Sequence, residues 1–293
     1  MMEDVSRRAF TRFELLIVLL LMGVVLLMFL LAAPAWRENA RTMDCRRNLG
    51  QIGVALAHYA TLHHDELPPI EMGGQGPLAV LLQTVGDPDF RRLGSDLPTQ
   101  ARTDLAPVVA SRVAGLVCPS DAISVPADFP APVSYRANTG QGTDGQDGPF
   151  APGKTSRFPE IEELKGLSFT AAFSERLVGN GRSVAASVNY ARSPGPIAET
   201  GCSKVPATAW RGDAGSSWLK TDWSSTLYNH ARPPDQPSSC VASDDATALM
   251  GASSGHGGRV HVLLLDGSVK VYRSQVSPTI WKALGKARDG SGP

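Results

Sequence analysis

The sequence has little charge and no excess of either sign. Lys and Arg together number 28, Asp and Glu number 28, and charged residues make up 19% of the 293 residues, against about 25% in an average soluble domain. A nucleic-acid-binding domain shows a clustered basic excess. We therefore expect no nucleic acid among the partners of this chain.

Cysteine is also scarce, with four residues in the chain. That number is too small for a disulfide-dense small domain. Neither a Cys-x-x-Cys nor a His-Glu-x-x-His cluster occurs, and these are the closely spaced patterns that indicate zinc. We expect no metal and no cofactor. Disorder of the whole chain is excluded as well, because 42% of the residues are hydrophobic and the net charge is zero.

The most informative feature present is an uncharged apolar segment from Leu15 to Ala33. As a helix, its 19 residues would span about 28 Å, close to the hydrocarbon thickness of a bilayer. Arg7, Arg8 and Arg12 precede it, and a basic flank favours the cytoplasmic side. The segment predicts a single-pass protein of the cytoplasmic membrane, inserted in the lipid bilayer with its N-terminus in the cytoplasm and everything after about Trp36 on the extracytoplasmic side.

Three hypotheses explain this N-terminus. It is a plain signal anchor, a cleaved export signal or a processed anchor. Arg7-Arg8 is typical of a twin-arginine start, and Ala33-Pro34-Ala35 offers a cleavage site before Trp36. The apolar segment is longer than the 7–15 residues usual in a cleaved signal.

The processed anchor is suggested by a resemblance. Residues 7–16 resemble the prepilin start of type IV pilins and type II secretion pseudopilins, with a basic leader that ends in Ala9, then Phe10, then Glu14 at the fifth mature position. The resemblance implies that a prepilin peptidase and methylase cleaves between Ala9 and Phe10 and methylates the new N-terminus. It also implies that Glu14 pairs with the N-terminal amine of a neighbouring pilin-like subunit. Ala9 stands where that family usually has Gly, and Arg12 where it prefers an apolar residue. A capping box of Thr11 and Glu14 explains the same carboxylate without assembly.

An amphipathic helix follows the apolar segment. Pro34 should kink the helix where the two segments join, and Pro68-Pro69 should end the amphipathic part. One face carries residues at spacings of three and four, and a sheet is expected to cover this face. These residues are Cys45, Leu49, Ile52, Leu56, Tyr59 and His63.

A second resemblance covers nearly the whole chain. The sequence is similar to a planctomycete family of prepilin-like proteins that has a domain of unknown function and a C-terminal His-x9-Asp-Gly motif. The matching segments are 45–53, 116–121, 134–140, 173–176 and 229–234, followed by the motif itself. Here the motif is His256, Asp266 and Gly267. The resemblance supplies no chemistry for it, and we expect a structural role, with a ligand role for His256 as the alternative.

The rest of the chain predicts an exported α+β domain. Val260–Leu265 and Ser268–Tyr272 read as a hairpin with a type I′ turn at Asp266-Gly267. Ser277-Pro278 opens a short helix, from which Trp281 and Leu284 should fold back onto the hairpin. Further strands are expected at 133–136, 167–175 and 183–188, and irregular loops over 189–250.

The fold class is therefore α+β, with a long N-terminal helix packed on an antiparallel sheet with long loops, as in pilins. We expect a leader at 1–9, a transmembrane and assembly helix at 10–35, its exported continuation at 36–66 and the α+β domain at 67–293.

Two patterns that resemble catalytic or nucleotide sites lack their context. Residues 251–255 spell Gly-x-Ser-x-Gly beside His256, but a strand follows where a nucleophile elbow needs a helix. Residues 140–145 spell Gly-x-Gly-x-x-Gly, but no helix follows to face a pyrophosphate. Asp144 and Asp147 in this loop give calcium weak support, because their spacing is not that of an EF-hand. We expect no enzyme.

The four cysteines should pair after export. Cys202 with Cys240 would close a surface loop, which leaves Cys45 with Cys118 to tie the helix to the domain. Four cysteines allow three pairings, and the sequence does not choose among them. The predicted function is a structural subunit or accessory of a type IV pilus or type II secretion pseudopilus. The alternative is a non-polymerising binding or surface protein of the cell envelope, held by a signal anchor.

The mature N-terminus distinguishes the three hypotheses. N-terminal sequencing and mass spectrometry of the membrane-extracted protein should find methylated Phe10. A start at Trp36 would mean a removed export signal, and a start at Met1 an uncut anchor. Either of these two results would contradict prepilin processing.

Overall fold

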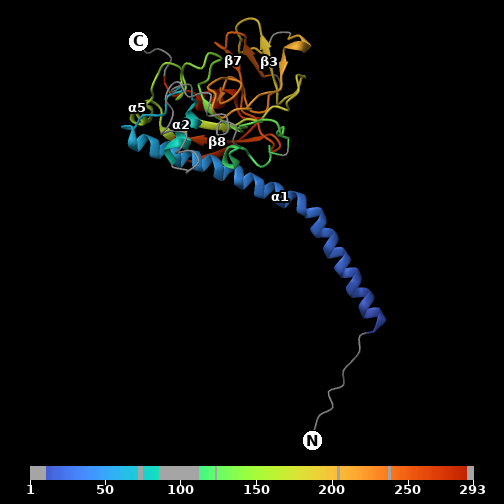
Figure 1. Cartoon of the computed structure of the whole chain (residues 1–293). Coiled ribbons are helices and arrows are strands. Elements are labelled where there is room, and N and C mark those ends of the chain that lie inside the picture. The colour runs from blue at the N-terminus through green and yellow to red at the C-terminus, as the bar shows by residue number, and fades with distance from the viewer. Residues whose placement is uncertain are drawn as a thin grey trace. The chain divides into compact units, whose positions relative to one another are not determined.

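The computed structural model describes residues 11–71, 75–85, 112–122, 124–202, 205–236 and 239–288. It divides the chain into two units, Met1–Arg41 and Thr42–Pro293, and helix α1 (Arg12–Leu62) runs through the boundary between them (Figure 1). The other helices among the described residues are α2 (Pro77–Val85), α5 (Phe158–Leu164) and α6 (Pro278–Gly285), with short 3-10 turns at Ala114–Leu116, Leu167–Phe169 and Ala207–Ala209. The strands are β1 (Tyr135–Asn138), β2 (Ala171–Glu175), β3 (Tyr190–Ser193), β4 (Trp210–Arg211), β5 (Leu227–Tyr228), β6 (Ser239–Ala242), β7 (Ala248–Leu249), β8 (Arg259–Leu264) and β9 (Val269–Arg273).

The N-terminal unit is the apolar part of α1. Its most apolar 18-residue window has a mean hydropathy of 3.3, and none of that window is buried within the chain. Among the described residues, α1 is the one helix long and apolar enough to cross a membrane. Pro34 lies inside the helix.

The C-terminal unit is built on a five-stranded sheet with the order β5-β1-β2-β8-β9. Neighbouring strands are antiparallel except β1 and β5, which run parallel. A second sheet has the order β4-β3-β6-β7, in which β3 and β6 are parallel. The predicted fold class is confirmed, with the correction that both sheets are mixed instead of purely antiparallel.

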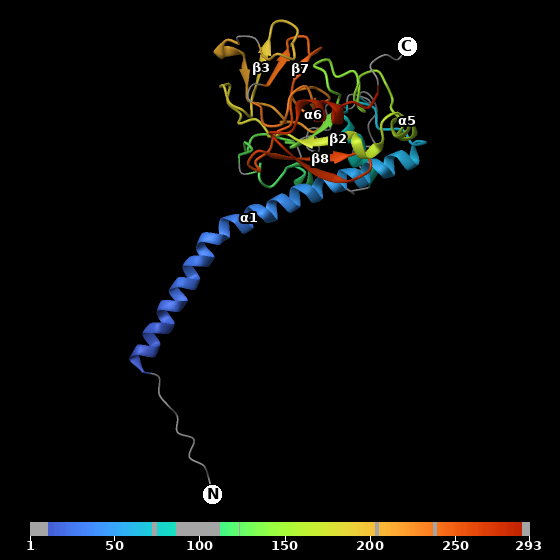
Figure 2. The same ribbon diagram turned by 180° about the vertical axis from the view of Figure 1, so that it is seen from behind.

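The five-stranded sheet has a helix on each face (Figure 2). Side chains alternate along a strand, so Val260, Val262 and Leu264 of β8 pack with Trp281 and Leu284 of α6. This confirms that α6 folds back onto the hairpin.

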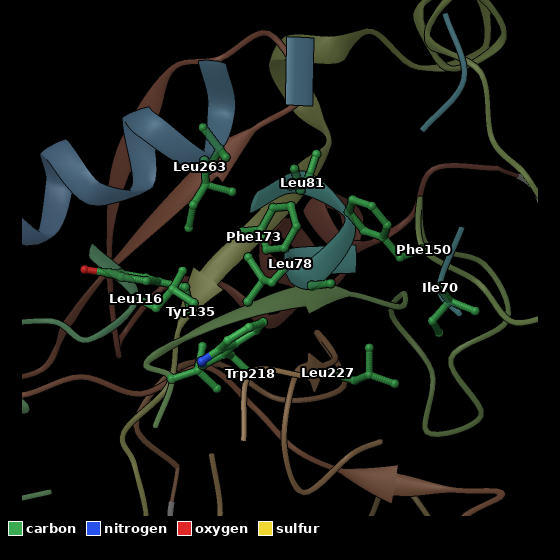
Figure 3. Close-up of a cluster of buried hydrophobic side chains, with 14 of the residues drawn as sticks. Ile70, Leu78, Leu81, Leu116, Tyr135, Phe150, Phe173, Trp218, Leu227 and Leu263 are labelled. Atoms are coloured by element: carbon green, nitrogen blue, oxygen red, sulfur yellow. The ribbon is translucent and has the colours of Figure 1, made fainter. Parts of the chain in front are cut away.

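The opposite face of the sheet, with Leu263 of β8, packs against the C-terminal part of α1. The predicted face of α1 is buried from Cys45 to Tyr59, while His63 is exposed and stacks on Tyr59 with ring centroids 4.0 Å apart. Around Phe173 of β2 the core also takes in Leu78 and Leu81 of α2 and Tyr135 of β1 (Figure 3).

Three local predictions need correction. Helix α1 ends at Leu62, before Pro68-Pro69, because His64 and Asp65 have φ of 54° and 64° and the N–H of Asp65 bonds back to the carbonyl of Ala60, as in a Schellman cap. Residues 183–188 are not a strand; the neighbouring strand is β3. Residues 189–250 are not all loop, since the second sheet lies there.

The hairpin turn is also different from the prediction. Leu264 donates its N–H to the carbonyl of Ser268, which leaves a three-residue loop, Leu265–Gly267. In this loop Gly267 has φ of 84°, whereas Asp266 is not among the residues with positive φ. This is the geometry of a type I turn followed by a glycine bulge, and not of type I′.

Helix α6 approaches the sheet closely at its last residue. A Cβ on Gly285 would lie 2.5 Å from Cβ of His230. The His230 ring is fully buried, with Nδ1 2.8 Å from the Trp281 carbonyl and Nε2 2.8 Å from the Tyr228 hydroxyl. Burial lowers the pKa of His230 to about 3, so this ring packs as the neutral form.

We expect Gly285→Ala to lower the free energy of unfolding by about 2 kcal/mol, because the added methyl group overpacks a core that cannot yield. Urea unfolding of the full chain in detergent, followed by tryptophan fluorescence, measures this. The matched control is Gly50→Ala on α1, where a Cβ has open space and alanine favours the helix. Equal stability of the two variants would contradict the close packing of α6.

Candidate functional site

The first candidate site is the start of α1. The N–H and the hydroxyl of Thr11 both donate to Oε2 of Glu14, at 2.8 and 2.9 Å, and the N–H of Glu14 donates to the Thr11 hydroxyl at 3.2 Å. The predicted capping box is therefore present. It satisfies N–H groups that a helix start leaves without a partner. The expected cleavage residues Ala9 and Phe10 lie outside the described residues.

The second candidate site is the His-x9-Asp-Gly motif, which brackets one strand. His256 lies just before β8, and Asp266 and Gly267 lie in the loop just after it. Oδ1 of Asp266 accepts hydrogen bonds from the N–H and the hydroxyl of Ser268, at 2.9 and 2.6 Å. The motif spacing is thus the length of β8 plus its two junctions.

His256 belongs to a buried polar group that we call the Glu175 cluster, formed by Thr42, Cys118, Glu175, His256 and His261. The carboxylate at the end of β2 is its centre. Nε2 of His256 lies 3.3 Å from Oε1 of Glu175, and Nδ1 of His261 lies 3.0 Å from the same oxygen. The backbone N–H of His261 donates to Oε2 at 2.8 Å. His256 also contacts the Cys118 sulfur at 3.5 Å and the Thr42 hydroxyl at 3.2 Å.

The three charged or chargeable side chains of the cluster are shielded from water, with exposed fractions of 1% for Glu175, 3% for His256 and 1% for His261. Burial by itself would raise the pKa of Glu175. Hydrogen bonds from His256 and His261, and their charge, outweigh it and hold the pKa below its ordinary value. The carboxylate therefore stays ionised, and the two imidazoles supply the donors that a buried charge requires.

The serine of the Gly-x-Ser-x-Gly pattern is used for packing. The N–H of Ser253 donates to the carbonyl of Glu175 at 3.0 Å, and the Ser253 hydroxyl accepts from the N–H of Leu177 at 3.1 Å. The polar packing around Cys118, Ser253 and Glu175 leaves no space for a water molecule. A substrate has no room beside these side chains in this conformation.

The structure pairs the four cysteines as Cys45–Cys118 and Cys202–Cys240, which decides among the three pairings that the sequence left open. The sequence separations are 73 and 38 residues, and loops of this length contribute roughly 4 kcal/mol each in the chain-entropy model. The first bridge joins α1 to the segment before β1, and its Cys118 belongs to the Glu175 cluster.

The glycine-rich loop over 140–145 has no helix after it, as predicted. Oδ1 of Asp147 accepts from the N–H of Gln141 at 2.9 Å and closes the loop on itself. Within the described ranges, the one group of His, Cys, Asp and Glu close enough to share a metal ion is Cys45, Cys118, Glu175 and His256. Asp144 and Asp147 are not part of it, so the geometry adds nothing to the weak support for calcium.

Sequence reasoning missed Glu175 and His261. Two signals were present: a carboxylate that ends an apolar strand, and a histidine inside the apolar run 260–265. Each polar residue in such a strand needs a buried partner, but neither pattern names that partner.

Together these features define a class. The chain is an α+β protein of pilin-like arrangement, in which one N-terminal helix has an exposed apolar part and a part that packs against mixed sheets. The apolar helix and the two disulfides suggest a domain that is anchored and extracytoplasmic.

The comparison with known families is more specific. Residues 34–279 match the family described as "Protein of unknown function (DUF1559)", and the chain belongs to this family. The match begins after the apolar segment, so the family itself supplies no information on residues 1–33. No curated protein and no solved structure matches the chain.

We expect His256→Ala to lower the free energy of unfolding by about 3 kcal/mol at neutral pH, because it removes a donor from a buried carboxylate. Because the pKa of Glu175 is lowered in the fold, its ionised carboxylate stabilises the fold at pH values above the ordinary pKa of a glutamate. This contribution is lost as the pH falls through the lowered pKa. The difference in the free energy of unfolding between His256→Ala and the wild type should therefore become smaller below about pH 4.

Urea unfolding of the full chain in detergent at several pH values measures this difference. The control is His58→Ala, on the exposed side of α1, which should leave stability unchanged at all pH values. If the two variants were equally stable, the structural role of His256 would be refuted.

Proposed function

We propose that this protein is a prepilin-like, membrane-anchored structural subunit or accessory of a type IV pilus or type II secretion pseudopilus, processed between Ala9 and Phe10 and without enzymatic activity. The observation that carries the proposal is the exposed apolar part of α1, in which no residue of the most apolar window is buried by the chain. Such a surface requires lipid or other apolar helices.

The division of labour along α1 supports the same function. The C-terminal part of the helix is a component of a packed core that continues to Tyr59, and a disulfide fixes it at Cys45. In a subunit of this kind the apolar part of α1 contacts lipid before assembly and neighbouring helices after assembly. The partners are then the bilayer, the prepilin peptidase and other pilin-like subunits.

The location of the domain follows from the same segment. Arg12 precedes the apolar segment, which would place this end of the helix in the cytoplasm by the positive-inside rule. Two disulfides are stable in the oxidising compartment beyond the membrane. Both considerations support an N-terminus in the cytoplasm and an exported C-terminal unit.

The capping box favours a second candidate function. The carboxylate of Glu14 already accepts two hydrogen bonds from Thr11. It therefore caps the helix even in a protein that never assembles. In that case the protein is a non-polymerising binding or surface protein of the cell envelope. The two candidates differ in whether the carboxylate of Glu14 is needed for contacts between subunits.

We expect Glu14→Ala to abolish the ladders that a membrane-permeant crosslinker produces between copies in the native membrane. An unpaired N-terminal amine at the edge of the hydrocarbon costs several kcal/mol, which the carboxylate of a neighbour relieves. Immunoblots after crosslinking, with fractionation to confirm membrane localisation, measure the effect.

The control is Thr11→Ala, which breaks the capping box but keeps the carboxylate. It should retain the ladders. Ladders that survive Glu14→Ala would refute assembly through Glu14, and a wild type without ladders would support the anchored surface protein. Loss of the ladders in both variants would also refute a direct contact of Glu14 with a neighbouring subunit, because the lost helix cap would then be sufficient to explain the effect.

A further inference from the structure

The Cys45–Cys118 bridge lies against two other metal-ligating side chains. One donor atom of each of Cys45, Cys118, Glu175 and His256 lies within 4.8 Å of the other three. We infer that, when this bridge is reduced, these four residues form a binding site for a thiophilic divalent cation, with Zn²⁺ as the best fit. The inference does not depend on the proposed function.

The distances already present suit a tetrahedral ion. With bonds of about 2.3 Å to sulfur and about 2.0 Å to nitrogen and oxygen, ligand atoms lie about 3.3–3.8 Å apart. The Cys118 sulfur is 3.5 Å from Nε2 of His256, and that nitrogen is 3.3 Å from Oε1 of Glu175. The other ligand atoms lie within 4.8 Å of one another, and the two sulfur atoms have to separate from bonding distance to about 3.8 Å.

The residues around the four donors provide the second layer that a metal site needs. Ligating histidines and carboxylates are oriented by further hydrogen bonds. Nδ1 of His256 lies 3.2 Å from the Thr42 hydroxyl, which leaves Nε2 to face the ion. Glu175 keeps the hydrogen bonds from the backbone N–H and Nδ1 of His261.

The four ligands are also held by separate, ordered parts of the fold. Cys45 is on α1 and Glu175 on β2, while Cys118 and His256 lie in the segments before β1 and β8. The two ligands on the packed helix and strand are preorganised, and the bridge and the hydrogen bonds of His256 hold the other two beside them. The cation would make the same connection between α1 and the sheet that the disulfide makes.

The reaction is balanced by a dithiol reductant. It gives two electrons to the bridge, the S–S bond breaks, two cysteine thiols form, and the reductant becomes a disulfide. Binding of the cation then releases one proton from each thiol. A divalent cation and two thiolates sum to zero charge, so the buried site keeps only the charge of Glu175.

Cobalt(II) is the probe for this site. The full chain in detergent is unfolded, reduced with a dithiol, freed of the reductant and refolded without oxygen in the presence of Co²⁺. We expect one cobalt per chain, with the intense visible absorption of a tetrahedral ion and a near-ultraviolet band from thiolate charge transfer. Addition of Zn²⁺ should remove both bands, and the oxidised protein should show neither.

The variants test the ligands one by one. His256→Ala and Glu175→Gln should each weaken cobalt binding on the order of tenfold or more, and Cys45→Ser with Cys118→Ser should abolish the charge-transfer band. The matched control is Cys202→Ser with Cys240→Ser, a second bridge outside the metal-capable group, which should leave the spectrum unchanged.

The inference fails if the spectrum is lost in the control instead, or if the reduced wild type folds by circular dichroism without taking up cobalt. It also fails if His256→Ala, folded by the same measure, has the spectrum and affinity of the wild type. Cobalt uptake by the reduced wild type and by His256→Ala can both be measured even if the variant without Cys45 and Cys118 does not fold.

Discussion

The C-terminal unit depends on the burial of one face of α1 against the five-stranded sheet. Cys45, Leu49 and Leu56 have exposed fractions of 0 to 1%, so this part of the helix is core and not an appendage. The contact is close, because a Cβ on Gly53 would lie 2.9 Å from Leu263 of β8. Without this face of α1, α2 would be left to cover this side of the sheet, while α6 would still cover the other.

The periodicity of the sequence predicted this helix because its pattern is local. Spacings of three and four from Cys45 to Tyr59 specify a face regardless of what covers it. Its end was predicted too late, since Pro68-Pro69 are visible in the sequence, whereas the left-handed φ of His64 and Asp65 is not. The hairpin turn failed for a tertiary reason. Leu265 donates its N–H to the carbonyl of Thr170, just before β2, and packs in the core, while on the β9 side Leu264 is the last residue bonded and Leu265 stands in the loop.

The second sheet and the Glu175 cluster could not be predicted, because both depend on contacts between distant residues. Strands β4 and β7 have two residues each, too few for an alternation to be visible. The pairing of β3 with β6 is parallel, so the chain between them must return before it can pair. In the cluster, Glu175 and His261 are 86 residues apart, and a pattern along the chain carries no information about such a pair.

The fixed spacing of the His-x9-Asp-Gly motif has a physical explanation in β8. A six-residue strand is about 20 Å long, so His256 and Asp266 lie at opposite ends and cannot act together on one substrate. The interval between His256 and Asp266 matters because side chains along a strand alternate between its two faces. One residue more or less would turn His261 toward α6 and Val262 toward α1. Glu175 would then lose two of its donors, the N–H and Nδ1 of His261, and an ionised carboxylate would remain buried with His256 alone. The motif therefore marks the two ends of one strand, and the buried carboxylate of Glu175 enforces the register of that strand. This explains the motif better than a pair of catalytic residues does.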